Sequence, residues 1–107
     1  YLNGNPEYDT ATLRFEYTSL VTPHSVFDYD MDTRARLLRK QTVVHGYDPA
    51  LYESHRIWAT SADGTRVPIA LVHRRGLVRD GQNPTMLYGY GSYGINMEAS
   101  FNSDRLS

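Results

Sequence analysis

Apolar and polar residues alternate along much of this chain, and this alternation constrains the fold more than any other feature. The segment LRFEYTSL places Leu13, Phe15 and Tyr17 on one face, and SVFDYDM from Ser25 repeats the pattern. Successive side chains of a β-strand point to opposite faces of a sheet, so a period of two predicts strands. Together with RLLRKQ, which follows the short polar connection DTRA, these segments predict a three-stranded antiparallel meander over residues 11–41.

A second strand pair is predicted downstream. HRIWATS and TRVPIALVH flank ADG, in which Asp63 and Gly64 form the strongest short-range turn signal of the chain. Pro68 predicts an edge or a bulge in the second arm, because proline cannot donate to a strand ladder. PTMLYGY from Pro84 predicts a further strand. The intervening stretch 42–52 has no sustained period and reads as a connector, with only a possible helical turn at 48–52.

Composition excludes several classes of function. The 107 residues are 40% hydrophobic and 21% charged, which is typical of globular protein, and the net charge is −1. Acidic and basic residues are balanced in both halves, so neither a nucleic acid nor a membrane surface is expected as a partner. Cysteine is absent, which excludes disulfides and thiolate metal sites and fits a reducing, cytoplasmic setting. No run of about 18 apolar residues and no leader-like start are present.

A three-stranded meander followed by a separate hairpin is an unusual complete fold. It would expose one apolar sheet face and several strand edges unless other strands covered them. The sequence also lacks an initiator methionine. We therefore expect the chain to be a piece of a longer protein.

The stretch LYGYGSYG, residues 87–94, is the strongest candidate for a functional site. It combines three tyrosines with three glycines. Glycine permits tight turns and close approach of the backbone, whereas tyrosine presents a rigid ring that ends in a hydroxyl. The combination indicates the floor of a cleft lined by hydroxyl groups. On the residues alone, packing or a turn is the commoner role of such a tyrosine.

Other residues with chemical potential carry weaker signals. The histidines stand at no recognisable ligand spacing, so a metal site is not expected; they are His24, His45, His55 and His73. Ser92 lacks the glycine that stands two residues before the serine in a G-x-S-x-G elbow, and reads as a loop serine. The alternating acids Asp28, Asp30 and Asp32 indicate a solvated strand face. Trp58 is more typical of packing than of a substrate platform.

Three segments in order carry a resemblance to a known family: TLRFEYTSLVTPHSVFDYDM, YESHRIWATSADGTRVPIALVHRRG and NPTMLYGYGSYG. They resemble the prolyl oligopeptidase family of serine peptidases, and the GSYG sequence resembles its oligopeptidase B branch. The resemblance implies a seven-bladed β-propeller and an α/β-hydrolase domain. It makes this chain a mainly β fragment, with the last antiparallel blade in residues 1–41, an interdomain connector in 42–52 and the first hydrolase strands in 53–107.

The resemblance also implies a function. The family hydrolyses peptide bonds in short peptides by a Ser, Asp, His triad without a cofactor, and the oligopeptidase B branch favours Arg or Lys before the cut. Tyr90 matches the tyrosine of the family's oxyanion hole, and Tyr93 matches an aromatic position of the substrate pocket. Gly89, Gly91 and Gly94 would let the loop turn and approach the substrate. No triad residue falls within the chain, so the chain alone is expected to be inactive.

Two other classes of function remain open. A non-catalytic β module could bind a partner through its tyrosines, because aromatic residues are common at interfaces. A different α/β-hydrolase, such as an esterase, could share the strand order without a propeller. A G-x-S-x-G serine elbow downstream would favour a peptidase over a binding module, and blade-like repeats upstream would argue against an esterase. The oligomeric state is not indicated by the sequence.

Overall fold

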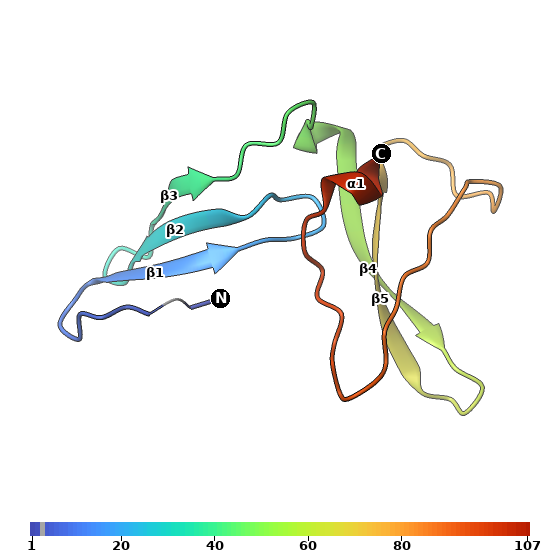
Figure 1. Cartoon of the computed structure of the whole chain (residues 1–107), viewed down its shortest axis with the longest axis horizontal. Helices are drawn as coiled ribbons and strands as arrows, with labels where there is room; N and C mark the ends of the chain where they lie inside the picture. The colour runs from blue at the N-terminus through green and yellow to red at the C-terminus, as the bar shows by residue number, and fades with distance from the viewer. Residues whose placement is uncertain (3) are drawn as a thin grey trace.

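Two separate antiparallel sheets make up the computed structural model, which describes residues 1–2 and 4–107 (Figure 1). The first sheet has the order β1-β2-β3, with β1 at Thr12–Tyr17, β2 at Ser25–Asp30 and β3 at Arg36–Gln41. The second is a hairpin of β4, Tyr52–Thr60, and β5, Arg66–Arg74. Both sheets were predicted from the alternation and the turn residues.

Cross-strand pairs hold the first sheet together. Phe15 lies opposite Phe27, and the two rings stack with their centroids 5.4 Å apart. Leu2 forms an isolated bridge with Phe15, which places the start of the chain along the outer edge of β1. At the end of β2, the Asp30 carboxylate accepts hydrogen bonds from the amides of Asp32 and Thr33, which closes the turn into β3. These local contacts explain why the predicted meander forms.

The second hairpin turns through three residues, Ala62, Asp63 and Gly64. The Gly64 amide donates to the Ser61 carbonyl at 2.9 Å, and the Ser61 amide donates to the Thr65 carbonyl at 2.9 Å. Gly64 has φ +85°, a left-handed conformation that favours glycine. Pro68 pairs in unbroken register with Trp58, so the strand has no bulge there, and β5 has one open edge among the described residues.

Helical structure is confined to short pieces in the described part of the chain. A 3₁₀-helix, η1, spans Pro49–Leu51 at the place where a helical turn was considered, and the Asp48 carboxylate caps it by accepting from the Ala50 amide. A four-residue helix, α1, at Ser103–Leu106 was not predicted; Asn102 caps it. None of the helices described here has the length and apolar character that crossing a bilayer requires.

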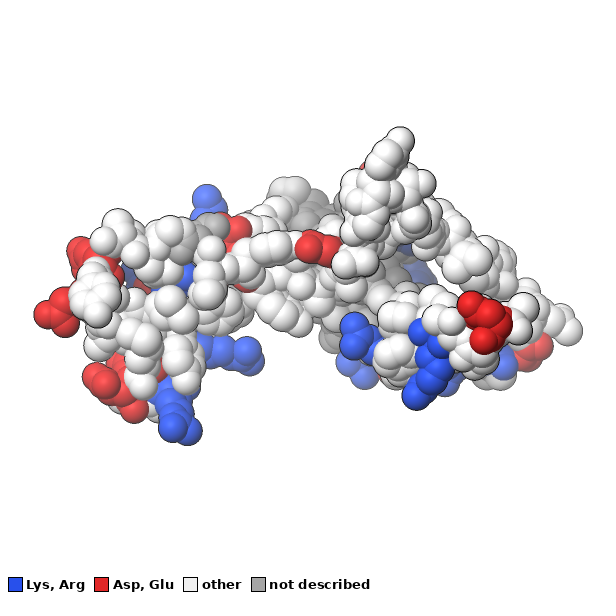
Figure 2. All heavy atoms as spheres, turned by 90° about the horizontal axis from the view of Figure 1, so that it is seen from below, with Lys and Arg blue, Asp and Glu red and all other residues white. Residues whose placement is uncertain are grey.

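The described residues enclose almost no core. Only Pro23 and Ser25 among them are buried, and Leu37, Trp58 and Val78 are all at least half exposed. The radius of gyration is 17.6 Å, whereas a compact domain of this length has about 13 Å. Figure 2 shows two lobes joined by a narrower middle, with acidic and basic side chains on both lobes of the face drawn. The apolar faces and open edges expected from the sequence are therefore present.

One tyrosine connects the two sheets. Tyr47, in the connector, donates its hydroxyl to the Val21 carbonyl at 2.5 Å, and its ring stacks on Tyr52 at the start of β4. The same ring meets Phe101 edge-on at 4.8 Å, and the Phe101 amide donates to the Thr18 hydroxyl. Partial burial raises the pKa of Tyr47 above its ordinary value. Tyr47 thus holds the connector against the loop that follows β1 and against the start of β4.

Candidate functional site

The tyrosine and glycine stretch lies in a long segment without regular structure between β5 and α1 (Figure 1). The prediction of a strand from Pro84 to Tyr90 is wrong for this structure. A strand needs a neighbour to accept and donate its backbone hydrogen bonds, and no described residue pairs with this stretch. No described strand therefore lies beside residues 84–90 to pair with them.

The three tyrosines of the stretch differ in their surroundings. Tyr90, the expected oxyanion residue, is 48% exposed, and its hydroxyl forms no hydrogen bond within residues 1–2 and 4–107. Tyr88 lies beneath the guanidinium of Arg105, with 4.9 Å between the guanidinium carbon and the ring centroid. Tyr93 is 92% exposed. The structure does not bring Tyr90 and Tyr93 into one pocket with other polar groups, so their roles stay predictions.

Tyr93 and Gly94 form a tight turn. Their φ angles are +56° and +65°, and the Ile95 amide donates to the Ser92 carbonyl at 3.1 Å. Two consecutive left-handed residues closed by this bond make a type I′ turn. A left-handed conformation is uncommon for tyrosine, so the turn holds Tyr93 in a strained geometry that projects its ring into solvent.

Only one of the three loop glycines turns the chain by its conformation. Gly94 has a positive φ, whereas Gly89 and Gly91 do not, and a Cβ at either of them would meet nothing within 4 Å. Gly94 thus adopts the conformation that a turn requires, and the expected roles of the three glycines in the site stay predictions. Close approach to a substrate stays a prediction for all three. Ser92 contributes only its backbone to the turn, as expected for a loop serine.

Two arginines surround one carboxylate on the first sheet. Asp28 accepts from Arg14 Nε at 2.7 Å and from Arg14 Nη2 at 2.9 Å, and Arg39 Nε lies 3.4 Å from it. The hydrogen bonds from Arg14, opposed by desolvation, hold the pKa of Asp28 below its usual value. Asp30 shapes a turn through its backbone contacts. These two acids hold the sheet and its turn together, and the Asp28 side chain is only 17% exposed, whereas the sequence predicted a solvated strand face.

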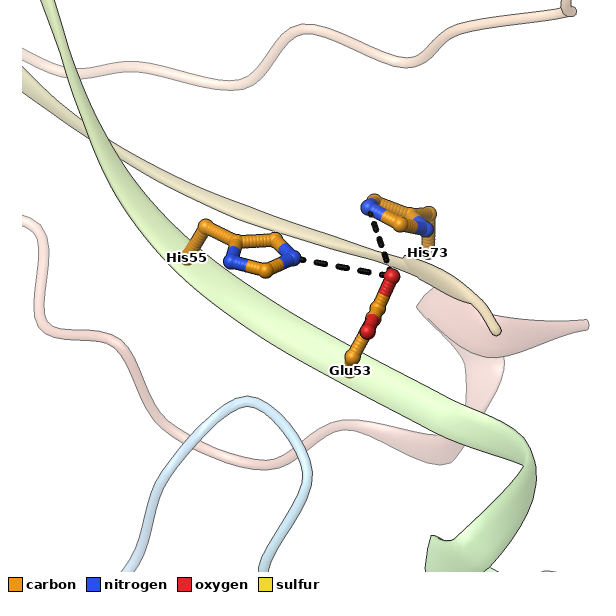
Figure 3. A group of neighbouring side chains, drawn as sticks. All are labelled: Glu53, His55 and His73. Carbon is orange, nitrogen blue, oxygen red and sulfur yellow. Dashed lines mark ion pairs between the residues drawn. The ribbon is translucent and has the colours of Figure 1, made fainter. Parts of the chain in front are cut away.

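The second sheet gathers three potential metal ligands that sequence reasoning did not bring together. Glu53 on β4 lies directly opposite His73 on β5, and His55 lies two residues along β4 from Glu53. Figure 3 shows the three side chains converging on one side of the hairpin. Only the spacing of the histidines along the chain entered the prediction, and the pairing of β4 with β5 brings His55 and His73 together. The three-residue turn that ends at Gly64 sets the register, so this turn is the signal that could have predicted the cluster.

The geometry of the cluster is that of a loose triangle. Glu53 Oε1 lies 3.6 Å from His55 Nε2 and 3.6 Å from His73 Nε2, and the ligand atoms all lie within 4.8 Å of one another. The imidazole rings stack with their centroids 5.3 Å apart. The second carboxylate oxygen of Glu53 faces Arg75 Nη1 at 3.8 Å. Both distances of 3.6 Å exceed the length of a hydrogen bond. The carboxylate oxygen therefore lies between the two rings and forms a hydrogen bond with neither of them.

Known proteins match both the sequence and the fold. Residues 1–42 match the N-terminal β-propeller domain of prolyl oligopeptidase. The dipeptidyl aminopeptidase BI of Pseudoxanthomonas mexicana is 41% identical over 107 residues, which are 99% of this chain and 15% of the relative. The structure of oligopeptidase B from Trypanosoma brucei with covalently bound antipain is similar over 90% of this chain and 14% of its own, with a TM-score of 0.74 and 43% identity.

A prolyl endopeptidase structure extends the match to 96% of this chain and 15% of its own, with a TM-score of 0.79 and 37% identity. The chain spans only about 15% of the length of the dipeptidyl aminopeptidase BI. The mainly β, antiparallel architecture agrees with the propeller domain of these proteins. By sequence and by fold, the chain belongs to the prolyl oligopeptidase family of peptidases.

Proposed function

We propose that this chain is part of a serine peptidase that hydrolyses peptide bonds in short peptides, with Arg or Lys before the cut. One observation carries the proposal: the chain is 43% identical to oligopeptidase B from Trypanosoma brucei over 90% of its length. The resemblance of GSYG to that branch supports the same assignment. Residues 1–41 would close the propeller, 42–52 would cross between domains, and 53–107 would open the α/β-hydrolase sheet. No cofactor is required by this chemistry.

In the proposed mechanism, Tyr90 acts on the carbonyl that is attacked. The nucleophilic serine, its histidine base and the orienting aspartate would come from parts of the peptidase outside this chain. A tyrosine hydroxyl donates a stronger hydrogen bond to an oxyanion than to a neutral carbonyl oxygen, so it stabilises the transition state preferentially. Tyr90 is half-exposed and its hydroxyl has no hydrogen-bond partner among the described residues, which is compatible with this role. Tyr93 would line the pocket for the residue before the cut.

A second candidate is the release of dipeptides from a free amino terminus. The observation that favours it is the 41% identity with a dipeptidyl aminopeptidase over 99% of this chain. The two candidates use the same hydrolytic chemistry and differ in whether the substrate must carry a free amino group two residues before the cut.

Fluorogenic amides separate these candidates in the full-length protein. The set comprises an N-blocked arginine amide, an unblocked dipeptide with arginine second, and an N-blocked proline amide. The proposal predicts that the blocked arginine substrate is cleaved much faster than the blocked proline substrate, and that a serine-directed fluorophosphonate abolishes the activity. Cleavage of the unblocked dipeptide alone would select the dipeptidyl activity. If the protein cleaves none of the three substrates and does not react with the fluorophosphonate, the peptidase assignment is overturned.

A further inference from the structure

We infer that Glu53, His55 and His73 form a binding site for a divalent transition metal ion of the zinc type, which joins β4 to β5 at the end of the hairpin away from its turn. Figure 3 shows two imidazole rings and one carboxylate facing a common point. Glu53 and His55 come from β4 and His73 comes from β5, so a bound ion would cross-link the two strands.

The burial of His73 is the first argument. Its side chain is only 10% exposed, and its Nε2 atom is buried with no hydrogen-bond partner among the residues that the structure describes. An unsatisfied buried nitrogen costs free energy, so a native structure normally supplies it with a partner. The nearest candidate, Glu53 Oε1, stays at 3.6 Å. A metal ion placed between the two atoms would satisfy both of them.

The tautomer of His73 is the second argument. Its Nδ1 atom lies 2.8 Å from the Arg74 carbonyl oxygen, which can only accept, so Nδ1 carries the proton. In the neutral ring, Nε2 then presents its lone pair toward Glu53 and His55. A backbone carbonyl that fixes the tautomer in this way is a typical partner of a metal-bound histidine. Glu53 is supported similarly, because Arg75 faces the oxygen that does not face the rings.

The distances are the third argument. Zinc bonds nitrogen and oxygen ligands at about 2.0–2.2 Å, so two ligands of a tetrahedral ion lie roughly 3.3–3.5 Å apart. The separations of 3.6 Å from Glu53 Oε1 to each Nε2 are close to this value. The ligand atoms lie within 4.8 Å overall, so small side-chain rotations complete the triangle.

Donor chemistry and access select the kind of ion. Two imidazole nitrogens with one carboxylate oxygen suit zinc and its transition-metal neighbours, whereas magnesium and calcium prefer oxygen ligands. The side chains of His55 and Glu53 are 42% and 32% exposed, so an ion can enter from solvent. With three protein ligands, the fourth position of a tetrahedral ion is left to water.

Zinc binding to the full-length protein tests the inference. Equilibrium dialysis against zinc chloride, followed by metal analysis, should show that His55→Ala and Glu53→Gln each lose one bound zinc per chain, or bind it at least about ten-fold more weakly. Both residues are partly exposed, so these variants are expected to fold; circular dichroism checks this. Cobalt should give visible absorption bands of a tetrahedral site in the wild type and not in the variants. Magnesium should not compete.

His24→Ala is the matched control. His24 Nε2 lies 2.9 Å from Glu16 Oε2, so this pair also brings a histidine next to a glutamate on a strand, but it does not belong to the three-ligand group. This variant should retain the zinc that the wild type binds. Equal zinc content and affinity in wild type, His55→Ala and Glu53→Gln would overturn the inference and leave the cluster as a pair of histidines sharing a carboxylate. Loss of the same zinc in His24→Ala would also overturn it.

Discussion

Arg39 lies in a β-bulge that places its guanidinium beside the Asp28 carboxylate. The pairing of β2 with β3 passes from Val26 opposite Lys40 to Phe27 opposite Leu38, so Arg39 is an extra residue in the ladder. A bulge of this kind redirects a side chain, and here the Arg39 guanidinium comes within 3.4 Å of Asp28. The same carboxylate already has a bidentate partner in Arg14.

Tyr90 carries the first residue-scale prediction, which concerns the full-length peptidase. Tyr90→Phe removes only the hydroxyl and keeps the ring, so stability should change little. If that hydroxyl donates to the oxyanion, kcat should fall on the order of 10²-fold or more, roughly 3 kcal/mol, with a smaller change in KM. Steady-state kinetics on an arginine substrate measures both constants.

Tyr88→Phe is the comparison for Tyr90→Phe. Tyr88 is a neighbouring tyrosine of the same stretch, and its ring contact with Arg105 does not need the hydroxyl. This variant should therefore keep kcat close to that of the wild type. Equal and small effects of both substitutions would make Tyr90 a packing residue.

Asp63 carries a prediction about pH. Hydrogen bonds from the Ser61 hydroxyl, and next from the Thr65 amide, lower the pKa of Asp63 to about 2. The folded-state pKa therefore lies below the unfolded value of about 3.9, so the carboxylate stabilises the turn above roughly pH 4. This contribution is lost as the pH falls through about 2. An NMR titration of the Asp63 carboxyl carbon should have its midpoint near 2 in the wild type and a higher midpoint in Ser61→Ala; an unchanged midpoint in that variant would contradict the assigned cause.

At the scale of the element, most of the β-structure was predictable because it depends on local signals. Alternation identified β1 and β2, and the turn residues Asp63 and Gly64 located the second hairpin. The segment from Pro84 has similar local character but no strand, because pairing depends on a neighbouring edge that local sequence does not specify. The Glu53 cluster was missed for a related reason: cross-strand neighbours follow from register, which spacing along the chain does not reveal.

The hairpin turn gives a prediction at this scale. Gly64→Ala forces a Cβ into a left-handed residue with φ +85°, which costs about 1–2 kcal/mol. In the full-length protein, amide hydrogen exchange of β4 and β5 should become about 5 to 30 times faster wherever it proceeds by opening of the hairpin. Gly4→Ala is the control, since Gly4 has no positive φ and a Cβ there meets nothing within 4 Å. Equal exchange rates in wild type and Gly64→Ala would show that the turn tolerates alanine.

At the scale of the whole molecule, this chain has two sheets and hardly any interior. Apolar side chains such as Leu37 and Trp58 remain half exposed, and the described residues bury only Pro23 and Ser25. Burial of apolar surface is the dominant favourable contribution to folding, so local turns and cross-strand pairs alone give little stability. The sequence anticipated the exposed faces, but it gave no indication of the contact between Tyr47 and Phe101 that links the sheets.

The missing interior gives the prediction at this scale. The 107-residue chain, purified by itself, should unfold over a broad temperature range without a cooperative heat-absorption peak. Differential scanning calorimetry, supported by circular dichroism, measures this. A sharp melt of a soluble monomer would contradict the prediction and would favour a self-contained β module over a part of a peptidase.

The position of Tyr47 has a mechanical consequence for the junction. Its hydroxyl is bonded to Val21, beyond the end of β1, while its ring rests on Tyr52, the first residue of β4. If one sheet rotates relative to the other, the Tyr47 ring must move with it or the hydrogen bond from Tyr47 to Val21 must break. Rotation of one sheet against the other is therefore opposed by this hydrogen bond, and also by the hydrogen bond from the Phe101 amide to the Thr18 hydroxyl. Tyr47→Phe would keep the ring contact with Tyr52 and remove the hydrogen bond to Val21, so the two sheets should then rotate more freely against each other.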